Sequence, residues 1–456
     1  MANLATRRTV LSGCFQLSLA AFGVSFLCMG VAAQMESERL LEEITVYAQK
    51  RAENAQQVPV AVTAMTAEMI RETGMLDVVR LSELHPSVYF DTAQSWQRNS
   101  LKIRGIGTIG NTRSFEGAVG VFIDGVYRSR SGMALADLLD VERLEVLRGP
   151  QSTLFGKNTV AGAIALSSIR PNPGAMEGHA EVRFGNHDFR YLTGAVNIPV
   201  GDTAALRLAA VDNQRDGFFE SPDTGDEYDE VDRYALKAQF LFGLGDDWEV
   251  NVAVDRAKSD APCCWGSAQV VNGPTSGLID TYSTLNGFTF VPAPTAEDDR
   301  ANTLNEVPRE LVEDFGILAT VDWAAGNNWT FKSVTAVRNW EHSQIRVDPD
   351  FVPADLFILT EPAEIDWFSQ EFNLNYSTDR LDLLLGLYYS KEDYWSERSA
   401  ETGSDADNYL KALISSGFGS VACLPPVVAT DCLYPVGIAA LLPDGEFSRE
   451  IYEQDS

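Results

Sequence analysis

Basic residues are scarce in this chain of 456 residues, in which 35 lysines and arginines face 65 aspartates and glutamates and leave a formal net charge of −30. A surface this acidic repels phosphates over most of its area, so we exclude nucleic acid as a partner. Histidine is rarer still: His85, His179, His187 and His342 are scattered along the chain, and no serine elbow accompanies them. We therefore predict no catalytic site, no bound metal and no cofactor, and we expect that the protein is not an enzyme.

Long apolar runs are also lacking after residue 33, where no stretch approaches the roughly 20 residues of a membrane-spanning helix. The start of the chain has the order of a signal peptide, with Arg7 and Arg8, an apolar run of sixteen residues (17–32) and small side chains up to Ala33. We predict a signal peptide over residues 1–33 and an exported protein. Such a chain is either soluble or an outer-membrane β-barrel, because in lipid only helices and closed barrels satisfy all backbone hydrogen-bonding groups.

Cysteines are few, and after the predicted signal peptide only Cys263, Cys264, Cys423 and Cys432 remain. An oxidising compartment favours their pairing. We predict a disulfide between Cys423 and Cys432, which bracket a short proline-containing loop. Cys263 and Cys264 are adjacent, so their Cα atoms lie about 3.8 Å apart, below the usual separation in a disulfide. A strained bridge between these two remains an alternative, and a metal role is not expected without nearby histidines.

From about residue 178 the sequence is dominated by short segments in which apolar and polar residues alternate. In 233–242, for example, Tyr234, Leu236 and Phe240 fall on one side of a strand, and Lys237 falls on the other. The same period of two recurs at 248–255, 315–323 and 368–376. A β-sandwich alternates in the same way, so the period alone predicts a mainly β protein and does not choose between sandwich and barrel.

The lengths of the connections between these segments favour the barrel. Short links are found at 201–203, 243–247, 324–328 and 377–380, and long links at 212–232, 256–312, 339–365 and 391–446. Short turns on one rim and long loops on the other are typical of outer-membrane barrels. Trp248, Trp323 and Trp329 flank the short turns, where an aromatic girdle would meet the membrane interface. We predict an antiparallel transmembrane β-barrel over residues 178–456.

Residues 58–170 form a separate unit of small mixed α+β character, with helical stretches expected at 67–80 and 134–139. Within it, Gly105, Gly107 and Gly110 match the G-x-G-x-x-G pattern of dinucleotide-binding loops. A dinucleotide site needs a helix that opens at this loop and holds the pyrophosphate at its N-terminus. Here a glycine-punctuated loop and then a strand follow, so we reject a dinucleotide site.

The same glycines belong to a larger constellation of four blocks, which reads LKIRG at 101–105, VGVFIDGVY at 119–127, VERLEVLRGPQSTLFG at 141–156 and NTVAGAI at 158–164. Over about 110 residues, this order closely resembles the plug domain of TonB-dependent outer-membrane receptors. The resemblance implies that the plug is followed by the family's 22-stranded barrel. We count nine complete strands and the opening of a tenth, so we expect a barrel that is incomplete relative to the family.

A polar linker over residues 34–57 precedes the plug and contains one β-prone island. It consists of Glu43, Ile44, Thr45, Val46, Tyr47 and Ala48. The island resembles the family's TonB box, which pairs by strand addition with TonB, the periplasmic energy transducer. An ordinary linker with chance β-propensity is the alternative.

The resemblance also implies ligand-binding loops at the upper end of the plug. The candidate residues are Trp96, Arg98, Asn111, Arg113 and Phe115. Arginine together with aromatic rings suits an anionic chelate, although the same loops could merely fill the lumen. Ferric siderophore is the ligand class we name first, with vitamin, haem or carbohydrate as alternatives. A surface-binding barrel without energised transport remains a second alternative.

Plug arginines of this family pair with carboxylates on the inner wall of the barrel. Arg104 and Arg148 resemble them, and Glu371, on an inward-facing strand position, is the candidate partner. Such pairs hold the plug in place because breaking one leaves a costly unpaired charge. The sequence thus predicts a protein of the outer membrane, with lipid, TonB and a small ligand as its partners.

Overall fold

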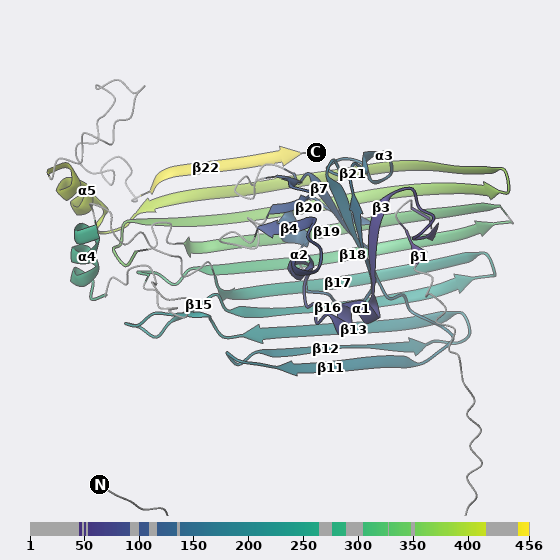
Figure 1. Cartoon of the computed structure of the whole chain (residues 1–456), viewed down its shortest axis with the longest axis horizontal. Coiled ribbons are helices and arrows are strands. Elements are labelled where there is room, and N and C mark those ends of the chain that lie inside the picture. Colours follow the sequence, from purple (N-terminus) through teal and green to yellow (C-terminus); the bar gives the residue numbers. More distant parts are fainter. Residues whose placement is uncertain are drawn as a thin grey trace, which may run out of the picture. The chain divides into compact units, whose positions relative to one another are not determined.

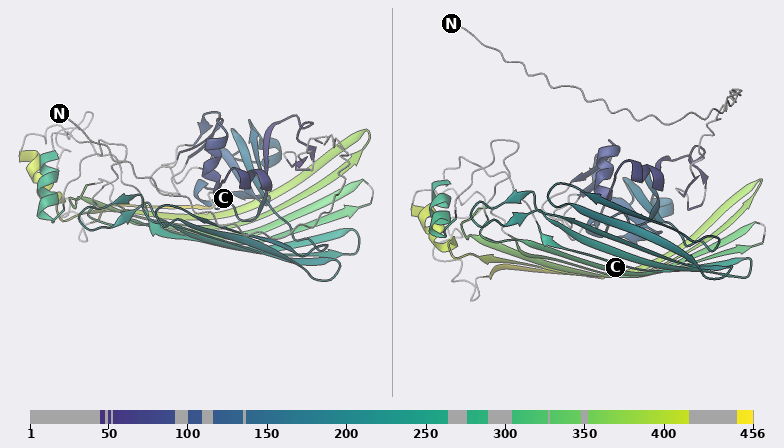
Figure 2. Two further views of the ribbon diagram at one scale, coloured as in Figure 1. Left: turned by 60° about the horizontal axis from the view of Figure 1, so that its bottom comes forward. Right: turned by 90° about the horizontal axis from the view of Figure 1, so that it is seen from below.

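The computed structural model describes residues 45–47, 50–51, 53–91, 100–108, 116–134, 137–263, 276–288, 304–326, 328–347, 352–415 and 446–455. Most of these residues belong to two β-sheets, which confirms the mainly β fold class. We call the described residues between 45 and 170 the N-terminal unit, and the ten-stranded sheet that follows the large sheet. The N-terminal unit lies against one face of the large sheet (Figure 2).

A five-stranded mixed sheet forms the centre of the N-terminal unit. Its strand order is β3 (Ala61–Thr66), β9 (Val141–Arg148), β10 (Gly162–Ser168), β7 (Val119–Ile123) and β8 (Val126–Arg128). β10 and β7 run parallel, and the other neighbours are antiparallel. β7 and β8 are joined by Asp124 and Gly125, with φ of 53° and 84°, as an Asp-Gly hairpin turn requires.

The remaining elements of the N-terminal unit surround this sheet. They are β1 (Thr45–Val46), β2 (Glu53–Asn54), β4 (Val88–Asp91), β5 (Ser100–Ile103), β6 (Ile106–Gly107), α1 (Ala67–Glu72), α2 (Leu81–Leu84), α3 (Ser152–Phe155) and the 3-10 helices Val78–Arg80 and Ser131–Ala134. Leu81, Ile103, Leu144 and Ile164 are completely buried between them. Alternation of apolar residues along β9 and β10 thus provides the core of this unit.

Two helix predictions for this unit need correction. The helix expected over 67–80 ends at Glu72, because Gly74 adopts a left-handed φ of 69° that a helix cannot continue. The side chain of Asp77 then caps a separate 3-10 helix by accepting a hydrogen bond from the Arg80 amide. The helix expected over 134–139 is wrong: a 3-10 helix ends at Ala134, and Asp137 forms an isolated β-bridge with Asp77. That pairing requires an extended backbone.

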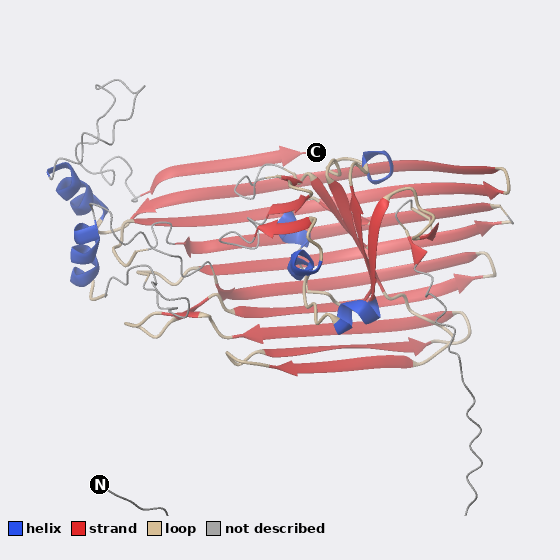
Figure 3. Ribbon diagram, viewed as in Figure 1, coloured by secondary structure: helices blue, strands red, loops and turns tan. Residues whose placement is uncertain are grey.

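All ten strands of the large sheet are antiparallel to their neighbours (Figures 1 and 3). They are β11 (Glu177–Phe184), β12 (Arg190–Pro199), β13 (Ala204–Arg215), β16 (Val231–Leu244), β17 (Trp248–Pro262), β18 (Arg309–Ala325), β19 (Trp329–Val347), β20 (Phe357–Thr378), β21 (Leu381–Thr402) and β22 (Glu446–Asp455). A separate two-stranded ribbon, β14 (Phe219–Glu220) with β15 (Glu227–Tyr228), lies in the β13–β16 connection. Among the described strands, β11 and β22 are the edges of the sheet.

The four short links are confirmed, and all lie at one end of the sheet (Figure 1). All four long links are shorter than predicted, because the strands beside them continue further, and the link predicted at 339–365 is reduced most, to 348–356. β20 and β21 contain 22 residues each. The error arises because apolar alternation reports only the part of a strand with an apolar face, whereas backbone hydrogen bonds extend the ladder into polar sequence. The longest connections that remain carry α4 (Ser276–Leu285) and α5 (Ala406–Ser415).

Candidate functional site: the contact between the N-terminal unit and the large sheet

The two faces of the large sheet differ in polarity. On β16, Leu236 and Phe240 are 50% and 40% exposed on the outer face, while Lys237 and Gln239 are buried beneath the N-terminal unit. Successive side chains on a strand point to opposite faces, so one strand serves both surfaces. The outer face is therefore largely apolar, and the inner face supplies charged and polar side chains to the contact.

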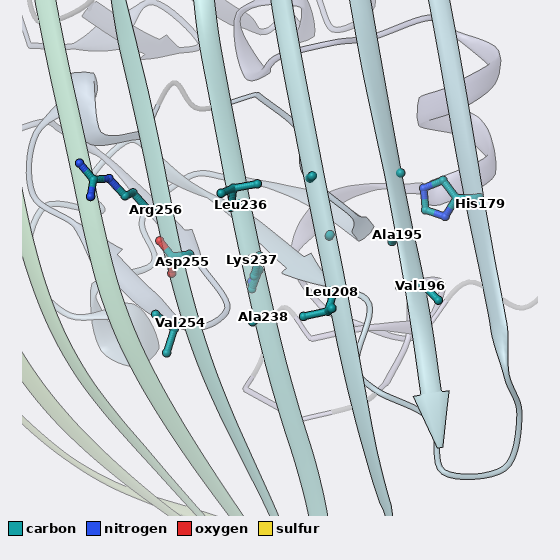
Figure 4. Close-up of a pocket in the computed structure, with 13 residues that line it drawn as sticks. His179, Ala195, Val196, Leu208, Leu236, Lys237, Ala238, Val254, Asp255 and Arg256 are labelled. Atoms are coloured by element: carbon teal, nitrogen blue, oxygen red, sulfur yellow. The ribbon is translucent and has the colours of Figure 1, made fainter. Parts of the chain in front are cut away.

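An apolar depression of about 670 Å³ lies in the outer face (Figure 4). Leu208, Leu236 and Val254 project around it, from β13, β16 and β17. Near one end of this face, Trp248 stacks on Trp323 with ring centroids 4.8 Å apart, and Trp329 packs against Tyr376 at 4.5 Å. The aromatic residues that flank the short turns thus pair across neighbouring strands. The apolar side chains that project around it lie on the outer face, while Lys237 of the ionic contact with Asp124 is also among the residues that line it.

On β13 and β16, basic residues of the sheet bind carboxylates of the N-terminal unit. Both carboxylate oxygens of Asp140 accept hydrogen bonds from Arg207, through Nε and one terminal nitrogen at 2.6 Å each, and both side chains are almost completely buried. This bidentate geometry is the strong form of an arginine–carboxylate pair. Lys237 forms an ion pair with Asp124, which also accepts a hydrogen bond from the Ser168 amide at 2.7 Å.

The carboxylates in this region titrate in opposite directions. Burial would raise the pKa of Asp124, but Lys237 and the hydrogen bonds from Ser168 outweigh it and hold the pKa below its usual value. One carboxylate oxygen of Asp137 lies 3.1 Å from the Arg233 guanidinium and accepts a hydrogen bond from the side-chain amide of Asn213, also at 3.1 Å. In this case burial dominates over these partners and raises the pKa of Asp137.

On β17 to β21 the polarity is reversed, because the sheet is acidic and the N-terminal unit is basic. Lys50 pairs with Glu371 at 3.0 Å, and Arg130 pairs with Glu392 at 3.0 Å. The Arg130–Glu392 pair is almost completely buried, and the guanidinium of Arg130 lies 4.8 Å from the Tyr394 ring centroid. Three further residues make a third contact: Arg170 donates to Glu249 and Asp322 at 2.9 and 3.0 Å.

Arg130 also connects the sheet to Glu116, which lies 3.9 Å from it. Burial would raise the pKa of Glu116, but hydrogen bonds from Lys157 at 2.7 Å and Asn158 at 2.5 Å, together with the charge of Arg130, lower it. The same Asn158 nitrogen donates to the Tyr127 hydroxyl at 2.9 Å. Burial, followed by the charge of Glu116, raises the pKa of Tyr127, so this phenol remains neutral.

The described residues of the predicted TonB box, 45–47, pack against the rest of the N-terminal unit. Thr45 and Val46 pair with Glu53 and Asn54 as a two-stranded ribbon, and Val46 is fully buried. The Tyr47 amide donates to the carboxylate of Glu145 at 2.8 Å. Arg143 reaches the same segment, because its guanidinium lies 4.4 Å from the Tyr47 ring centroid.

This docking has an electrostatic cost. Burial raises the pKa of Glu145, although the Tyr47 amide and Arg143 favour its charged form. Val46 belongs to the same apolar cluster as Phe122 of the N-terminal unit and Trp367 of β20. The box segment, the N-terminal unit and the large sheet therefore share one buried cluster. Glu43, Ile44 and Ala48 lie outside the described residues.

The predicted partners of Glu371 differ from those observed. Arg104 is exposed in the turn between β5 and β6, with a left-handed φ of 53°. Arg148 donates to the Thr63 hydroxyl at 3.0 Å, within the N-terminal unit. The structure thus gives Glu371 the partner Lys50 in place of Arg104 and Arg148. A lysine two residues beyond a linker motif carries no signal of such a role in the sequence.

Other predicted residues lie outside the described part of the chain. They are Trp96, Arg98, Asn111, Arg113, Phe115, Cys423 and Cys432. Cys263 is disulfide-bonded, and its partner also lies outside that part. The described residues contain no group of three or more histidine, cysteine, aspartate or glutamate side chains arranged to hold a metal ion. None of the described helices has the length and apolarity needed to span a membrane.

Comparison with known proteins identifies the N-terminal unit. Residues 54–163 match the family model of the TonB-dependent receptor plug domain. The catecholate siderophore receptor Fiu of Escherichia coli K12 is 30% identical over 126 residues, which cover 27% of this chain and 15% of that receptor. The pesticin receptor of Yersinia pestis is 26% identical over 215 residues, or 45% of this chain and 31% of the receptor.

Among solved structures, the ferric yersiniabactin uptake receptor FyuA from Yersinia pestis superposes with a TM-score of 0.63 at 18% identity. The match covers 75% of this chain and half of FyuA, and at this identity it shows the fold alone. The matched regions thus span less than a third of these curated relatives and half of the solved structure. Residues 54–163 thus match the plug domain of TonB-dependent receptors, and the chain is similar to siderophore receptors of this kind, in sequence over part of its length and in fold over three quarters of it.

Proposed function

We propose that this protein takes up a ferric siderophore across the outer membrane, with energy that TonB delivers through residues 43–48. One similar protein is named as a catecholate siderophore receptor and another as a ferric yersiniabactin uptake receptor, and these names support the ligand class. Vitamin, haem and carbohydrate uptake are the alternatives within the same mechanism. In this proposal the protein is a transporter and has no enzymatic activity.

The observation that carries the proposal is the position of Lys50. Two residues after the proposed box, its ammonium pairs with Glu371 of the large sheet and lies 4.9 Å from the Phe155 ring centroid and 5.6 Å from that of Phe122. Tyr47 already contacts β9 of the central sheet through Glu145; along the chain, tension applied to residues 43–48 then meets Lys50 before it reaches β3 (Ala61–Thr66). A mostly buried ion pair resists opening because its separation leaves unpaired charge, so Lys50 is placed to transmit a pull to the plug.

The outer face of the large sheet supports a membrane location. Its exposed leucine, phenylalanine and valine side chains suit lipid, and the paired aromatic residues near the short turns suit a membrane interface. We propose that the strands from β11 onward span the outer membrane after removal of residues 1–33. Plug domain 58–170, linker 34–57 and the Cys423–Cys432 disulfide complete the proposed organisation.

The ligand is proposed to bind through Trp96, Arg98, Asn111, Arg113 and Phe115. A hydrogen bond between two described residues supports this location. The Thr108 hydroxyl donates to the Glu116 carbonyl at 3.2 Å, and these two residues stand directly before and after part of the proposed site. Glu116 in turn is linked through Arg130 to Glu392 on β21. A ligand held here would thus contact a segment that is connected directly to the sheet.

The test is deletion of residues 43–48 in cells that depend on this protein for iron. We expect binding of a radiolabelled ferric siderophore at the cell surface to persist while its energised uptake is lost. Val46→Pro provides a finer variant, because proline removes a backbone donor needed for strand addition, and Val46→Ile is its matched control. Uptake at the wild-type rate after the deletion would rule out the proposed energy transfer through residues 43–48, and surface binding without uptake in the wild type would favour the alternative of a surface-binding barrel.

A further inference from the structure

Three connections lie at the end of the large sheet opposite the short turns and pack together. The first joins β17 to β18 and contains α4, the second joins β19 to β20, and the third joins β21 to β22 and contains α5. In Figure 1, α4 and α5 lie together beyond this end of the strands. We call the described residues 276–288, 304–308, 352–356 and 403–412 of these connections the cap.

The second connection is the centre of the cap. Val352, Ala354 and Leu356 are each at most 5% exposed, although they lie in a short link between two strands. Ile279 and Tyr282 of α4 and Tyr409 of α5 pack against them. The rings of Tyr282 and Tyr409 also contact each other edge to face, with centroids 6.2 Å apart. Each connection therefore covers apolar groups that belong to the other two.

Hydrogen bonds join the second and third connections reciprocally. The Asp355 amide donates to the carboxylate of Asp405 at 3.1 Å, and the Asp405 amide donates to the Asp355 carbonyl at 2.9 Å. The Ser404 amide donates to the Asp355 carboxylate at 2.7 Å. Gly403 passes so close that a Cβ at this position would overlap the Asp355 carbonyl oxygen. The two chain segments are thus locked at one point.

The first connection is attached to both of the others. The Asn286 side-chain amide donates to the Asp405 carboxylate at 2.6 Å, and that of Asn305 donates to the Asp355 carboxylate at 3.0 Å. Asp355 and Asp405 therefore hold all three connections. α4 and α5 have only ten residues each, and isolated helices of this length are marginally stable in water. Their order depends on the contacts between connections.

We infer that the cap forms a single lid that opens as one unit, held closed by Asp355 and Asp405. Three independent loops would each open at their own rate. A shared core and shared hydrogen bonds make partial opening costly, because release of one connection exposes the apolar side chains of the other two. This inference concerns the opening of one end of the large sheet, and it does not depend on which ligand the protein takes up.

The test is hydrogen–deuterium exchange on the full chain, with Asp355→Ala compared to wild type. We expect the amides of α4 and of α5 to exchange about tenfold faster or more, as loss of the two hydrogen bonds from Asn305 and Ser404 to the Asp355 carboxylate implies, while β17 to β21 keep their protection. Under conditions where closing is slow, both helices should exchange at one common rate. Asp280→Ala is the matched control, since Asp280 lies exposed on α4 and should leave exchange unchanged.

Faster exchange confined to residues 352–356 and 403–406, with α4 as in wild type, would overturn the inference. If Asp355→Ala also reduces the protection of β17 to β21, the variant has lost more than the cap, and Asn286→Ala takes its place. That variant removes one exposed side-chain hydrogen bond between the first and third connections. Faster exchange in both helices supports the single lid, and a change in α4 alone contradicts it.

Discussion

The plug is held by two regions of the large sheet with opposite charge. On β13 and β16, Arg207, Lys237 and Arg233 bind carboxylates of the plug; on β17 to β21, carboxylates of the sheet bind Lys50, Arg130 and Arg170. Complementary patches of opposite sign fix one orientation of the plug, because a rotated plug would bring like charges together. The two regions also differ in their connection to the proposed box, because only the second region binds a residue that closely follows the box, Lys50.

The two regions are expected to hold the plug with different strength. The Arg207–Asp140 pair is bidentate and almost completely buried, whereas Lys50 and Glu371 retain 14% and 12% exposure. The first region should therefore hold the plug more firmly than the Lys50 contact does. A pull on residues 43–48 acts on the weaker contact first. The plug would then loosen on the β20 side while Asp140 keeps its attachment to β13.

The largest effect is expected for Arg207→Ala, which leaves Asp140 buried without its partner. Loss of one member of a buried pair typically costs about 3–5 kcal/mol of unfolding free energy, and denaturant unfolding of the protein in detergent would measure it. The double variant Arg207→Met with Asp140→Leu should recover most of this loss, because no unpaired charge remains. An equal loss for Arg190→Ala, an exposed residue paired with Gln214, would show that the buried pair has no special role.

A smaller effect is expected for Glu371→Gln, which removes the charge opposite Lys50 and should cost roughly 1–3 kcal/mol at this partial burial. The loss should be local, because Lys50 is the nearest described link between the box segment and the sheet. Limited proteolysis would measure it as faster cleavage before residue 58, with the sheet still intact. If cleavage near Asp140 becomes faster to the same extent in this variant, the proposed difference between the two regions is contradicted.

The smallest effect is a pair of opposite pH dependences in the first region. The pKa of Asp137 is raised in the folded protein, so the folded state binds more protons and the free energy of unfolding falls as pH rises above about 4. The pKa of Asp124 is lowered, so its contribution is present above about pH 4 and is lost as pH falls through the folded pKa. Unfolding midpoints measured between about pH 3 and 8 would check both dependences.

Substitutions separate the contributions of Asp137 and Asp124 to the pH dependence of stability. Asp137→Asn should flatten the decline above about pH 4, and Asp124→Asn should flatten the loss at lower pH. The two variants are matched controls for each other, since both replace a carboxylate at the same contact with an uncharged side chain. Slopes of the same sign in both variants would contradict the assignments that burial prevails at Asp137 and that Lys237 and the Ser168 hydrogen bonds together outweigh burial at Asp124.

Much of the fold could be predicted because it depends on local pattern. Asp124-Gly125 specifies a tight turn between two apolar runs, and β7 and β8 meet there. Alternating residues on β16 and β17 place their apolar side chains on one face. Where the local pattern ends, prediction failed: β20 and β21 continue through polar sequence, and the helix expected to continue to Arg80 ends before Gly74. Neighbouring strands and a left-handed glycine decided these boundaries.

The sequence by itself determined the order of the domains, the β period and the plug motifs, since each depends on residues close together in the chain. It did not determine the ion pairs, because a partner is fixed by strand register and by which face of the large sheet meets the plug. Lys50 and Glu371 are 321 residues apart, and a shift of one residue in β20 would turn Glu371 to the outer face. Only the tertiary structure could assign Lys50 as the partner of Glu371, where the sequence had suggested Arg104 and Arg148.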